Sequence, residues 1–303
     1  MTSRGPGLTP SRISGRAGDA AYGLGWALTK RLPEPVAQAA FAQIADQIWR
    51  RGGSGVRRLQ ANLRRARPEA DDAEIARLSR AAMRSYLRYW CEAFRLPAWS
   101  REQVLERVVV HDEHILRDAY ASGRGVVAPL PHLANWDLAG VWACMTGMPL
   151  TTVAERLEPE RLFRRFVAYR ESLGMEVLPL TGGDPPIRTL FDRARDGGLI
   201  CLVADRDLSA GGVEVDLLGR PARLPAGPAM IARTTGAVLM PVTLAYEGPR
   251  LHVRLYEPVP PKPGADGVRA MTQQVADAFS EGIRAHPQDW HMLQKVFVED
   301  LGP

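Results

Sequence analysis

The residues best suited to chemistry lie in the stretch GVVAPLPHLANWDLAGVWA, between Gly125 and Ala143. An apolar run ends at a proline, His132 follows at once, and Asp137 comes five residues later, where a helical pattern begins. In open α/β sheets, ligands bind at the carboxyl ends of strands, which is where this turn falls. We therefore expect Asp137 to hold the His132 imidazole in one tautomer, so that the histidine accepts a proton from a substrate hydroxyl.

Whether the two side chains meet depends on the secondary structure in which each residue lies. Side chains five apart on an α-helix differ in direction by roughly 140°, so His132 and Asp137 meet only if His132 lies in the turn before the helix. The alternative is that His132 caps the helix or hydrogen-bonds locally, because an H-x4-D spacing often arises by chance. The spacing alone leaves both interpretations open.

The pattern beyond Val108 indicates the fold. Short apolar runs alternate with helical patterns, which is typical of an α/β fold with a mostly parallel or mixed central sheet flanked by helices. Upstream the pattern is helical, and DDAE at Asp71 offers a cap for a long helix. We predict a flexible tail over residues 1–18 and a single α/β domain over 19–303, in which 19–98 form an N-terminal helical elaboration.

The composition and net charge limit the classes of partner that we expect. Hydrophobic residues make up 46% of the 303 residues and charged residues 24%, which indicates a globular protein. A net charge of +5 favours an anionic partner, such as nucleic acid, acidic lipid headgroups or a phosphorylated cofactor. No signal peptide and no apolar run of spanning length is visible. The aromatic residues do not interleave with basic ones as in RNA-binding motifs, so a non-catalytic nucleic-acid or membrane-binding protein is the less favoured class.

The N-terminal helical segment suggests a membrane surface. Between residues 20 and 51, tryptophan, phenylalanine and leucine side chains are interleaved with lysine and arginine. Basic residues flanking such a face suit a helix that lies in the interface of a bilayer. The alternative is that this face packs against the rest of the protein.

No residue stands out as a covalent nucleophile. Cys91, Cys144 and Cys201 are isolated in apolar segments without a CxxC pair, and no GxSxG elbow occurs. Direct transfer through a histidine base therefore fits better than a covalent enzyme intermediate. A zinc site or disulfide framework is not expected, and the cysteines favour a reducing cytoplasmic compartment.

The segment HLANWD resembles the H-x4-D motif of the glycerolipid acyltransferases. Nearly the whole chain is more similar to the lipid A late-acyltransferase superfamily, and within it to the actinobacterial phosphatidylinositol mannoside acyltransferases. The blocks that carry the resemblance are GLGWALTKRLPE, RRGGSGVRRLQANLRR, PHLANWDLAG, FVAYRESLGMEVLPL, VADRDLSAGGVEVDLLGRPARLPAGPAMIARTTGA and HPQDWHMLQKVF. The last two are the most specific, because neither reduces to a generic pattern.

The resemblance implies a glycerolipid-acyltransferase-like fold with membrane-facing N-terminal helices and a peripheral position at the cytoplasmic face of the plasma membrane. It implies transfer of palmitoyl from acyl-CoA to the mannose 6-hydroxyl of a phosphatidylinositol mono- or dimannoside. Acyl-CoA would be a co-substrate, with no further cofactor, no metal and no nucleic-acid partner. The alternative within enzymes is a lipid A-type acyltransferase that uses acyl carrier protein and another glycolipid.

The resemblance also assigns roles to residues. Asp205 in VADRDL falls near the family's second acidic position, although Asp207 remains the alternative, and an EGTR-like block is absent. With His132 and Asp137, Asp205 completes the expected catalytic set. The expected substrate-binding residues are Glu155, for sugar hydroxyls, and Arg170, for the acceptor's phosphate, together with Asn135, Arg206, Asp207 and His291.

Several of these residues have plainer interpretations. The Asp205–Asp207 segment could be a solvated loop with internal pairing, and Arg170 could be one exposed helix arginine among several. Trp136, Trp142 and Met145 are interpreted as helix core rather than as the wall of an acyl tunnel. The reaction requires such a tunnel, but the sequence does not place it.

Overall fold

The computed structural model describes residues 29–155, 160–182, 185–207 and 211–300. The predicted tail over residues 1–18 lies outside this part of the chain. Two compact units make up the molecule. Among the described residues, the first unit contains those up to Trp99 together with His286–Lys295, and the second contains those of Ser100–Ala285 and those from Val296 onward. The predicted single domain over 19–303 thus divides in two: the described part of the predicted helical elaboration, residues 29–98, lies in a unit of its own, which a short C-terminal segment completes.

The first unit is a helical bundle. Its elements are α2 (Glu34–Arg51), α3 (Ser54–Ala66), α4 (Asp72–Arg95) and the short helices η1 (Leu96–Ala98) and η2 (Pro287–Asp289). The cap predicted at Asp71 is confirmed, since its side chain accepts a hydrogen bond from the Glu74 backbone N–H at 2.7 Å. Leu59, Leu63 and Met83 are fully buried in the core that α2, α3 and α4 share.

A buried carboxylate clamps two helices of this unit. Asp46 on α2 receives hydrogen bonds from Arg80 and from Arg84, both on α4, with Arg84 Nε and Nη2 each at 2.7 Å. Hydrogen bonds from these two guanidinium groups hold the pKa of Asp46 far below its ordinary range.

The second unit contains all the strands of the described chain and confirms the predicted α/β fold. In chain order its elements are α5 (Arg101–Arg107), β1 (Val108–His111), α6 (Glu113–Ala121), β2 (Val126–Leu130), α7 (Trp136–Met145), β3 (Leu150–Ala154), α8 (Glu160–Glu171), β4 (Glu176–Pro179), α9 (Ile187–Arg195), β5 (Leu199–Val203), β6 (Val213–Leu217), β7 (Arg220–Leu224), α10 (Gly227–Thr235), β8 (Val238–Leu239), β9 (Val242–Glu247), β10 (Arg250–Leu255), α11 (Gly267–Ala285) and η3 (Val298–Asp300).

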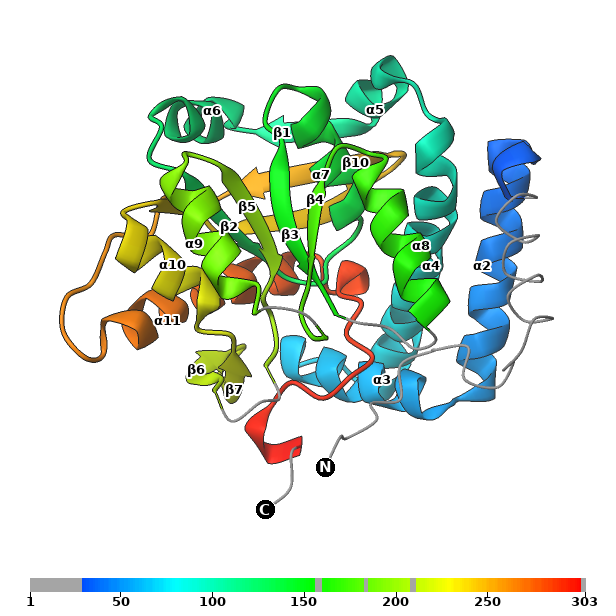
Figure 1. The fold of residues 1–303 in the computed structure, drawn as a ribbon. Coiled ribbons are helices and arrows are strands. Elements are labelled where there is room, and N and C mark those ends of the chain that lie inside the picture. Colours follow the sequence, from blue (N-terminus) through cyan, green and yellow to red (C-terminus); the bar gives the residue numbers. More distant parts are fainter. Residues whose placement is uncertain (1–28, 156–159, 183–184, 208–210, 301–303) are drawn as a thin grey trace. The chain divides into compact units, whose positions relative to one another are not determined.

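The main sheet has the strand order β4-β3-β5-β2-β8, and all of its pairings are parallel (Figure 1). β2 reads VVAPL and is buried along its whole length, as expected for a strand covered on both faces. Right-handed crossovers place α7 and α8 on one face of the sheet and α9 and α10 on the other. The carboxyl ends of β3, β5 and β2 therefore lie next to one another at one edge.

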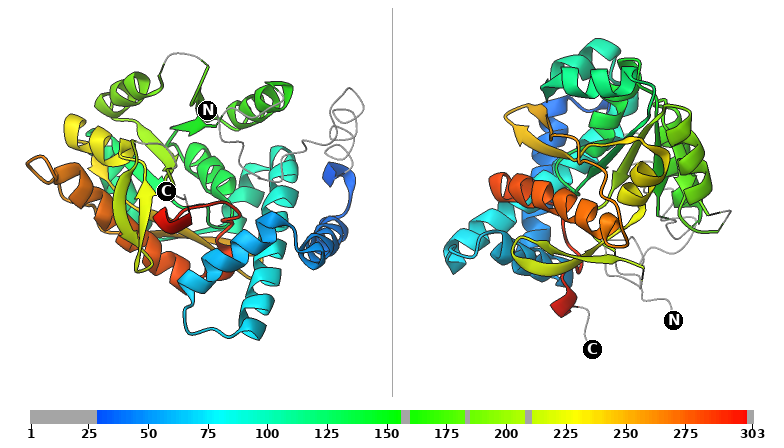
Figure 2. Two further views of the ribbon diagram at one scale, coloured as in Figure 1. Left: turned by 90° about the horizontal axis from the view of Figure 1, so that it is seen from below. Right: turned by 90° about the vertical axis from the view of Figure 1, so that its left-hand side faces the viewer.

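Two smaller sheets complete the unit. The apolar segment AVLMPVTLAY divides in two: β8 joins the parallel sheet, and after Pro241 the chain enters β9, which pairs antiparallel with β10 in the sheet β1-β10-β9. β6 and β7 form a hairpin that lies beside α11 (Figure 2). Within the described residues, no helix is both long and apolar enough to cross a membrane.

Candidate active site

His132 and Asp205 form the central contact of the site. His132 Nδ1 lies 2.6 Å from one carboxylate oxygen of Asp205, and the His132 backbone N–H donates to the other at 3.0 Å. Asp205 is completely buried, whereas the His132 side chain is about one-third exposed. If Nδ1–H donates to the carboxylate, the basic lone pair of the imidazole lies on Nε2. The pair therefore has the geometry of a general base with its orienting acid.

The strand pairing brings these two residues together. The Ala204 backbone N–H donates to Leu130 O at 2.8 Å, which extends the β2–β5 ladder to the edge of the sheet. The chain then turns sharply at His132, where the Leu133 N–H bonds to Pro131 O at 2.7 Å. His132 and Asp205 thus follow two neighbouring parallel strands and emerge side by side.

Asn135 ends this turn and starts α7. Its side-chain oxygen accepts a hydrogen bond from the Leu138 N–H at 2.9 Å, and the residue is fully buried. Ala134 just before it has a φ of 47°, in the left-handed region that residues with a Cβ rarely adopt. The structure therefore gives Asn135 the role of a helix cap, which fixes the turn, and the substrate contact expected from the sequence stays a prediction.

The expectation that Asp137 orients His132 is corrected on this point, because the structure places Asp205 in that position. Asp137 lies in the first turn of α7 and bonds to Arg170 on α8, with Nε–Oδ1 at 2.8 Å and Nη2–Oδ2 at 3.4 Å. The Arg170 side chain is only 16% exposed. This contradicts the interpretation of Arg170 as an exposed helix arginine. It also commits the guanidinium to a carboxylate of the protein, so the expected phosphate contact would have to share it.

Two further predicted residues pair with each other at the same edge. Glu155 follows β3 and is exposed, and its Oε2 lies 3.5 Å from Nη2 of the half-buried Arg206. Because β3 neighbours β5, this ion pair crosses between the ends of two adjacent strands, next to Asp205. The ion pair that Arg206 makes within the Asp205–Asp207 segment therefore joins the carboxyl ends of two neighbouring strands. Asp207 continues toward the hairpin, where its backbone N–H donates to Arg223 O at 2.6 Å.

His291 belongs to the first unit. Its Nε2 lies 2.9 Å from Ser85 Oγ, and that hydroxyl lies 2.6 Å from an oxygen of Asp289. All three side chains are buried. Sequence reasoning missed Ser85 and Asp289, and only the position of Asp289 two residues before His291 gave a local signal.

An apolar cavity adjoins the histidine within the second unit. It measures about 810 Å³, including the part that opens to solvent, and is lined by α7, the main sheet and the sheet of β9 and β10. The polar side chains on its wall include Asp137, Arg170 and Thr152. Trp136 and Trp142 also line it, so their interpretation as helix core alone is corrected. The Trp136 ring lies edge-on to the His132 ring at 5.3 Å and thus connects the base to the cavity.

The cysteines are poor nucleophiles in this fold. Cys201 lines the cavity, and burial raises the pKa of its thiol to about 12. Burial likewise raises the pKa of Cys91 to about 11. Thiolate is therefore scarce at neutral pH. Among the described residues, no group of three or more histidine, cysteine and acidic side chains is arranged to hold a metal ion.

The chain is similar to known acyltransferases along nearly its whole length. The model of the bacterial lipid A biosynthesis acyltransferase family matches residues 7–299. A phosphatidylinositol mannoside acyltransferase of Mycolicibacterium smegmatis is 47% identical over 292 residues, which cover 95% of this chain and 94% of that protein. Another of the same name, from Mycobacterium tuberculosis strain CDC 1551, is 44% identical over 295 residues, covering 96% and 92%.

Proposed function

The chain belongs to the family of bacterial lipid A biosynthesis acyltransferases, and we propose that it acylates a phosphatidylinositol mannoside. In this proposal a palmitoyl group moves from acyl-CoA to the mannose 6-hydroxyl of the mono- or dimannoside. The observation that carries the proposal is the His132–Asp205 pair beside an apolar cavity, joined to it by Trp136. The names of the two relatives support the choice of acceptor.

The proposed reaction has one general base. His132 Nε2 takes the proton from the mannose hydroxyl as its oxygen attacks the thioester carbonyl carbon. The tetrahedral intermediate collapses with cleavage of the carbon–sulfur bond, and the imidazolium returns the proton to the departing CoA thiolate. Asp205 stabilises the imidazolium, because its carboxylate accepts the Nδ1–H hydrogen bond at 2.6 Å. The positive end of the α7 dipole, directly after the turn, favours the oxyanion.

The two substrates approach this base from different sides in the proposal. The acyl chain occupies the apolar cavity, so that its carboxyl end lies by Trp136 and His132. The sugar approaches from the edge of the sheet, where Glu155 is exposed and can accept hydrogen bonds from mannose hydroxyls. Arg206 holds that carboxylate from the neighbouring strand, and Asp207 flanks the same loop.

The proposal includes a peripheral position on an anionic membrane at the cytoplasmic face, and the surface of α2 supports the contact with a membrane. Val36 and Ile44 on this helix are 52% and 45% exposed, and they are two of the four exposed large apolar side chains among the described residues. The helix ends in Arg50 and Arg51, both exposed. An apolar face with arginines at one end can insert shallowly among lipids while its cations bind headgroup phosphates.

The test is acyl transfer from radiolabelled palmitoyl-CoA to purified phosphatidylinositol dimannoside. We expect wild-type protein to form the acylated product and His132→Ala to form none, with circular dichroism showing that both are folded. His114→Ala, a change at an exposed histidine on α6, is the matched control and should keep wild-type activity. Activity that survives in His132→Ala would refute the proposed base. If the wild type is inactive with palmitoyl-CoA but active with palmitoyl carrier protein, the proposed donor is wrong.

A further inference from the structure

The wall of the apolar cavity contains a glycine whose replacement has a calculable effect. Gly140 lies on α7, one helical turn after Trp136, and lines the cavity. A Cβ at this position would lie 2.8 Å from Met175 Cε, 3.4 Å from its sulfur and 3.3 Å from Leu150 Cδ2. Met175 and Leu150 line the same cavity. Any side chain at position 140 therefore has to displace atoms of the cavity wall.

Met175 and Leu150 lie at the end of the cavity away from His132. Leu150 pairs with Leu199 at the start of β3 and β5, and Met175 directly precedes Glu176, which pairs with Thr151. Leu150, Met175 and Leu199 thus form a row at the amino edge of three neighbouring strands. His132 follows β2 at the carboxyl edge. A strand of five residues separates the two edges by about 16 Å.

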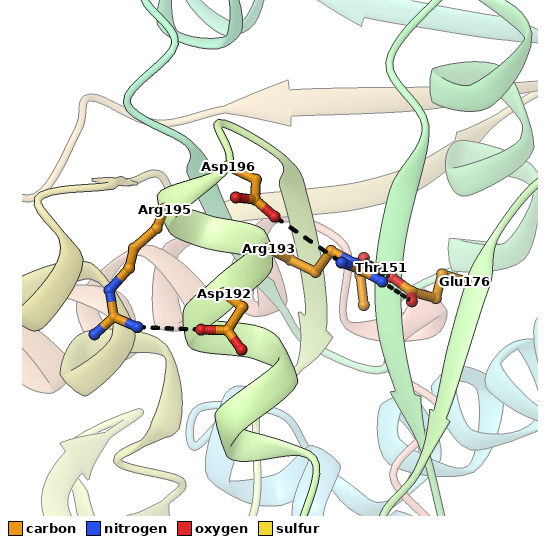
Figure 3. Close-up of polar contacts among 6 residues, drawn as sticks. All are labelled: Thr151, Glu176, Asp192, Arg193, Arg195 and Asp196. Atoms are coloured by element: carbon orange, nitrogen blue, oxygen red, sulfur yellow. Dashed lines mark hydrogen bonds and ion pairs between the residues drawn. The ribbon is translucent and has the colours of Figure 1, made fainter.

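The backbone beside Met175 is anchored. Figure 3 shows the side chains of Thr151 and Arg193 next to the Glu176 carboxylate. Thr151 Oγ1 donates to it at 2.7 Å, and Arg193 donates through Nε and Nη2 at 2.7 and 2.6 Å. These bonds tie the start of β4 to β3 and to α9. When an atom presses on Met175, the flexible thioether therefore moves more easily than the backbone.

We propose that the contact between Gly140 and Met175 sets the length of the acyl chain that the enzyme accepts, an inference that rests on the proposed function. A chain whose carboxyl end lies at His132 extends toward the row formed by Leu150, Met175 and Leu199. The absence of a side chain at Gly140 lets the Met175 thioether lie against α7. Interiors are close-packed elsewhere, so a methyl group at position 140 pushes the thioether into the cavity and shortens it.

Two substitutions test this with opposite signs. Gly140→Ala should favour shorter acyl donors. If one methylene group of the palmitoyl chain no longer fits into the cavity, the ratio of kcat/KM for palmitoyl-CoA to kcat/KM for myristoyl-CoA should fall about four-fold. Met175→Ala removes the thioether and should raise the preference for stearoyl-CoA over palmitoyl-CoA by at least the same factor. Because both changes act on one space, the double variant should return toward the wild-type profile.

The assay is a competition among acyl-CoAs from lauroyl to stearoyl, with the products resolved by mass spectrometry. Thermal stabilisation of each variant by the same acyl-CoAs gives a second measurement that needs no turnover. Gly227→Ala is the matched control, because a Cβ there meets nothing within 4 Å. It should leave both profiles unchanged. Alanine is favourable inside a helix, so Gly140→Ala is expected to fold.

The outcomes separate the two proposals. If Gly140→Ala and Met175→Ala are folded and their chain-length profiles equal that of the wild type, the inference is wrong, even where both variants keep full activity. If the wild type transfers no acyl group to the dimannoside, the proposed function fails, while the chain-length dependence of thermal stabilisation still tests the cavity. If no acyl-CoA stabilises the wild type either, the cavity holds no acyl chain and the inference fails with it.

Discussion

Replacement of Asp205 by asparagine tests which carboxylate serves His132. Both oxygens of Asp205 accept hydrogen bonds, one from Nδ1–H at 2.6 Å and one from the backbone N–H at 3.0 Å. The side-chain amide of the Asp205→Asn variant would keep one oxygen and present an NH2 group in place of the other. If the NH2 turns toward the backbone N–H, two donors face each other. If it turns toward Nδ1, it donates to that nitrogen, and the imidazole takes the tautomer with its proton on Nε2, which cannot act as a base. In both orientations the imidazolium loses its charged partner.

The magnitude follows from these two bonds. A hydrogen bond to a charged group contributes about 1.5–3 kcal/mol, and the loss of the compensating charge adds to it. A barrier raised by about 3–4 kcal/mol lowers kcat by about 10²- to 10³-fold. KM for the acyl donor should change little, because Asp205 is completely buried and is not among the residues that line the cavity.

The matched comparison is Asp137→Asn, which makes the same chemical change on the neighbouring carboxylate. Its bonds run to Arg170, so we expect a loss of thermal stability and a smaller reduction of kcat. Steady-state kinetics of both variants, with melting curves to establish folding, gives the answer. A kcat that falls more in Asp137→Asn than in Asp205→Asn, with both proteins folded, would refute the reasoning and restore the pairing expected from the sequence.

Three further predictions concern stability. Asp46→Asn should lower the free energy of unfolding by about 1 kcal/mol at neutral pH, since the two arginine partners of Asp46 are half-exposed. The folded-state pKa of Asp46 is depressed, so this stabilisation is present above the ordinary aspartate pKa range and is lost as pH falls below it. Urea melts of wild type and variant should therefore converge in acid. Ser85→Ala should cost about 1–3 kcal/mol in urea melts by leaving the buried Asp289 carboxylate without its hydroxyl donor, and an unchanged midpoint would contradict this. Glu176→Gln should lower the free energy of unfolding by less than about 1 kcal/mol, because the ion pair with Arg193 is partly exposed. Hydrogen bonds from Arg193 and, to a smaller extent, from Thr151 lower the pKa of Glu176. Thermal melts should therefore show the difference between wild type and variant at neutral pH and not in acid.

Local patterns in the sequence determined the elements. The apolar run before Pro131 predicted β2, and the helical pattern after Asn135 predicted α7, so His132 could be placed in the turn between them. The sequence also predicted the helix cap at Asp71, because a cap depends on residues only three positions apart. These features depend on interactions between neighbours in the chain, which the sequence displays directly.

The role of each carboxylate was decided by the tertiary structure. Asp205 reaches His132 because β5 lies beside β2, and the order of strands in a sheet leaves no mark in the periodicity of any one of them. The H-x4-D spacing pointed to Asp137, yet that side chain meets Arg170 on α8, 33 residues along the chain.

The cavity was decided in the same way. The tryptophans of α7 have the spacing of core residues, and only the packing of two sheets around that helix leaves open space against them. Gly140 is one more small residue in the sequence, and its contact with Met175 exists because β3 and β4 pair in one register. The sequence by itself thus determined β2, α7 and the position of His132 between them, since these depend on short-range periodicity. Which groups surround that histidine follows from contacts between distant segments, which form only when the whole unit packs.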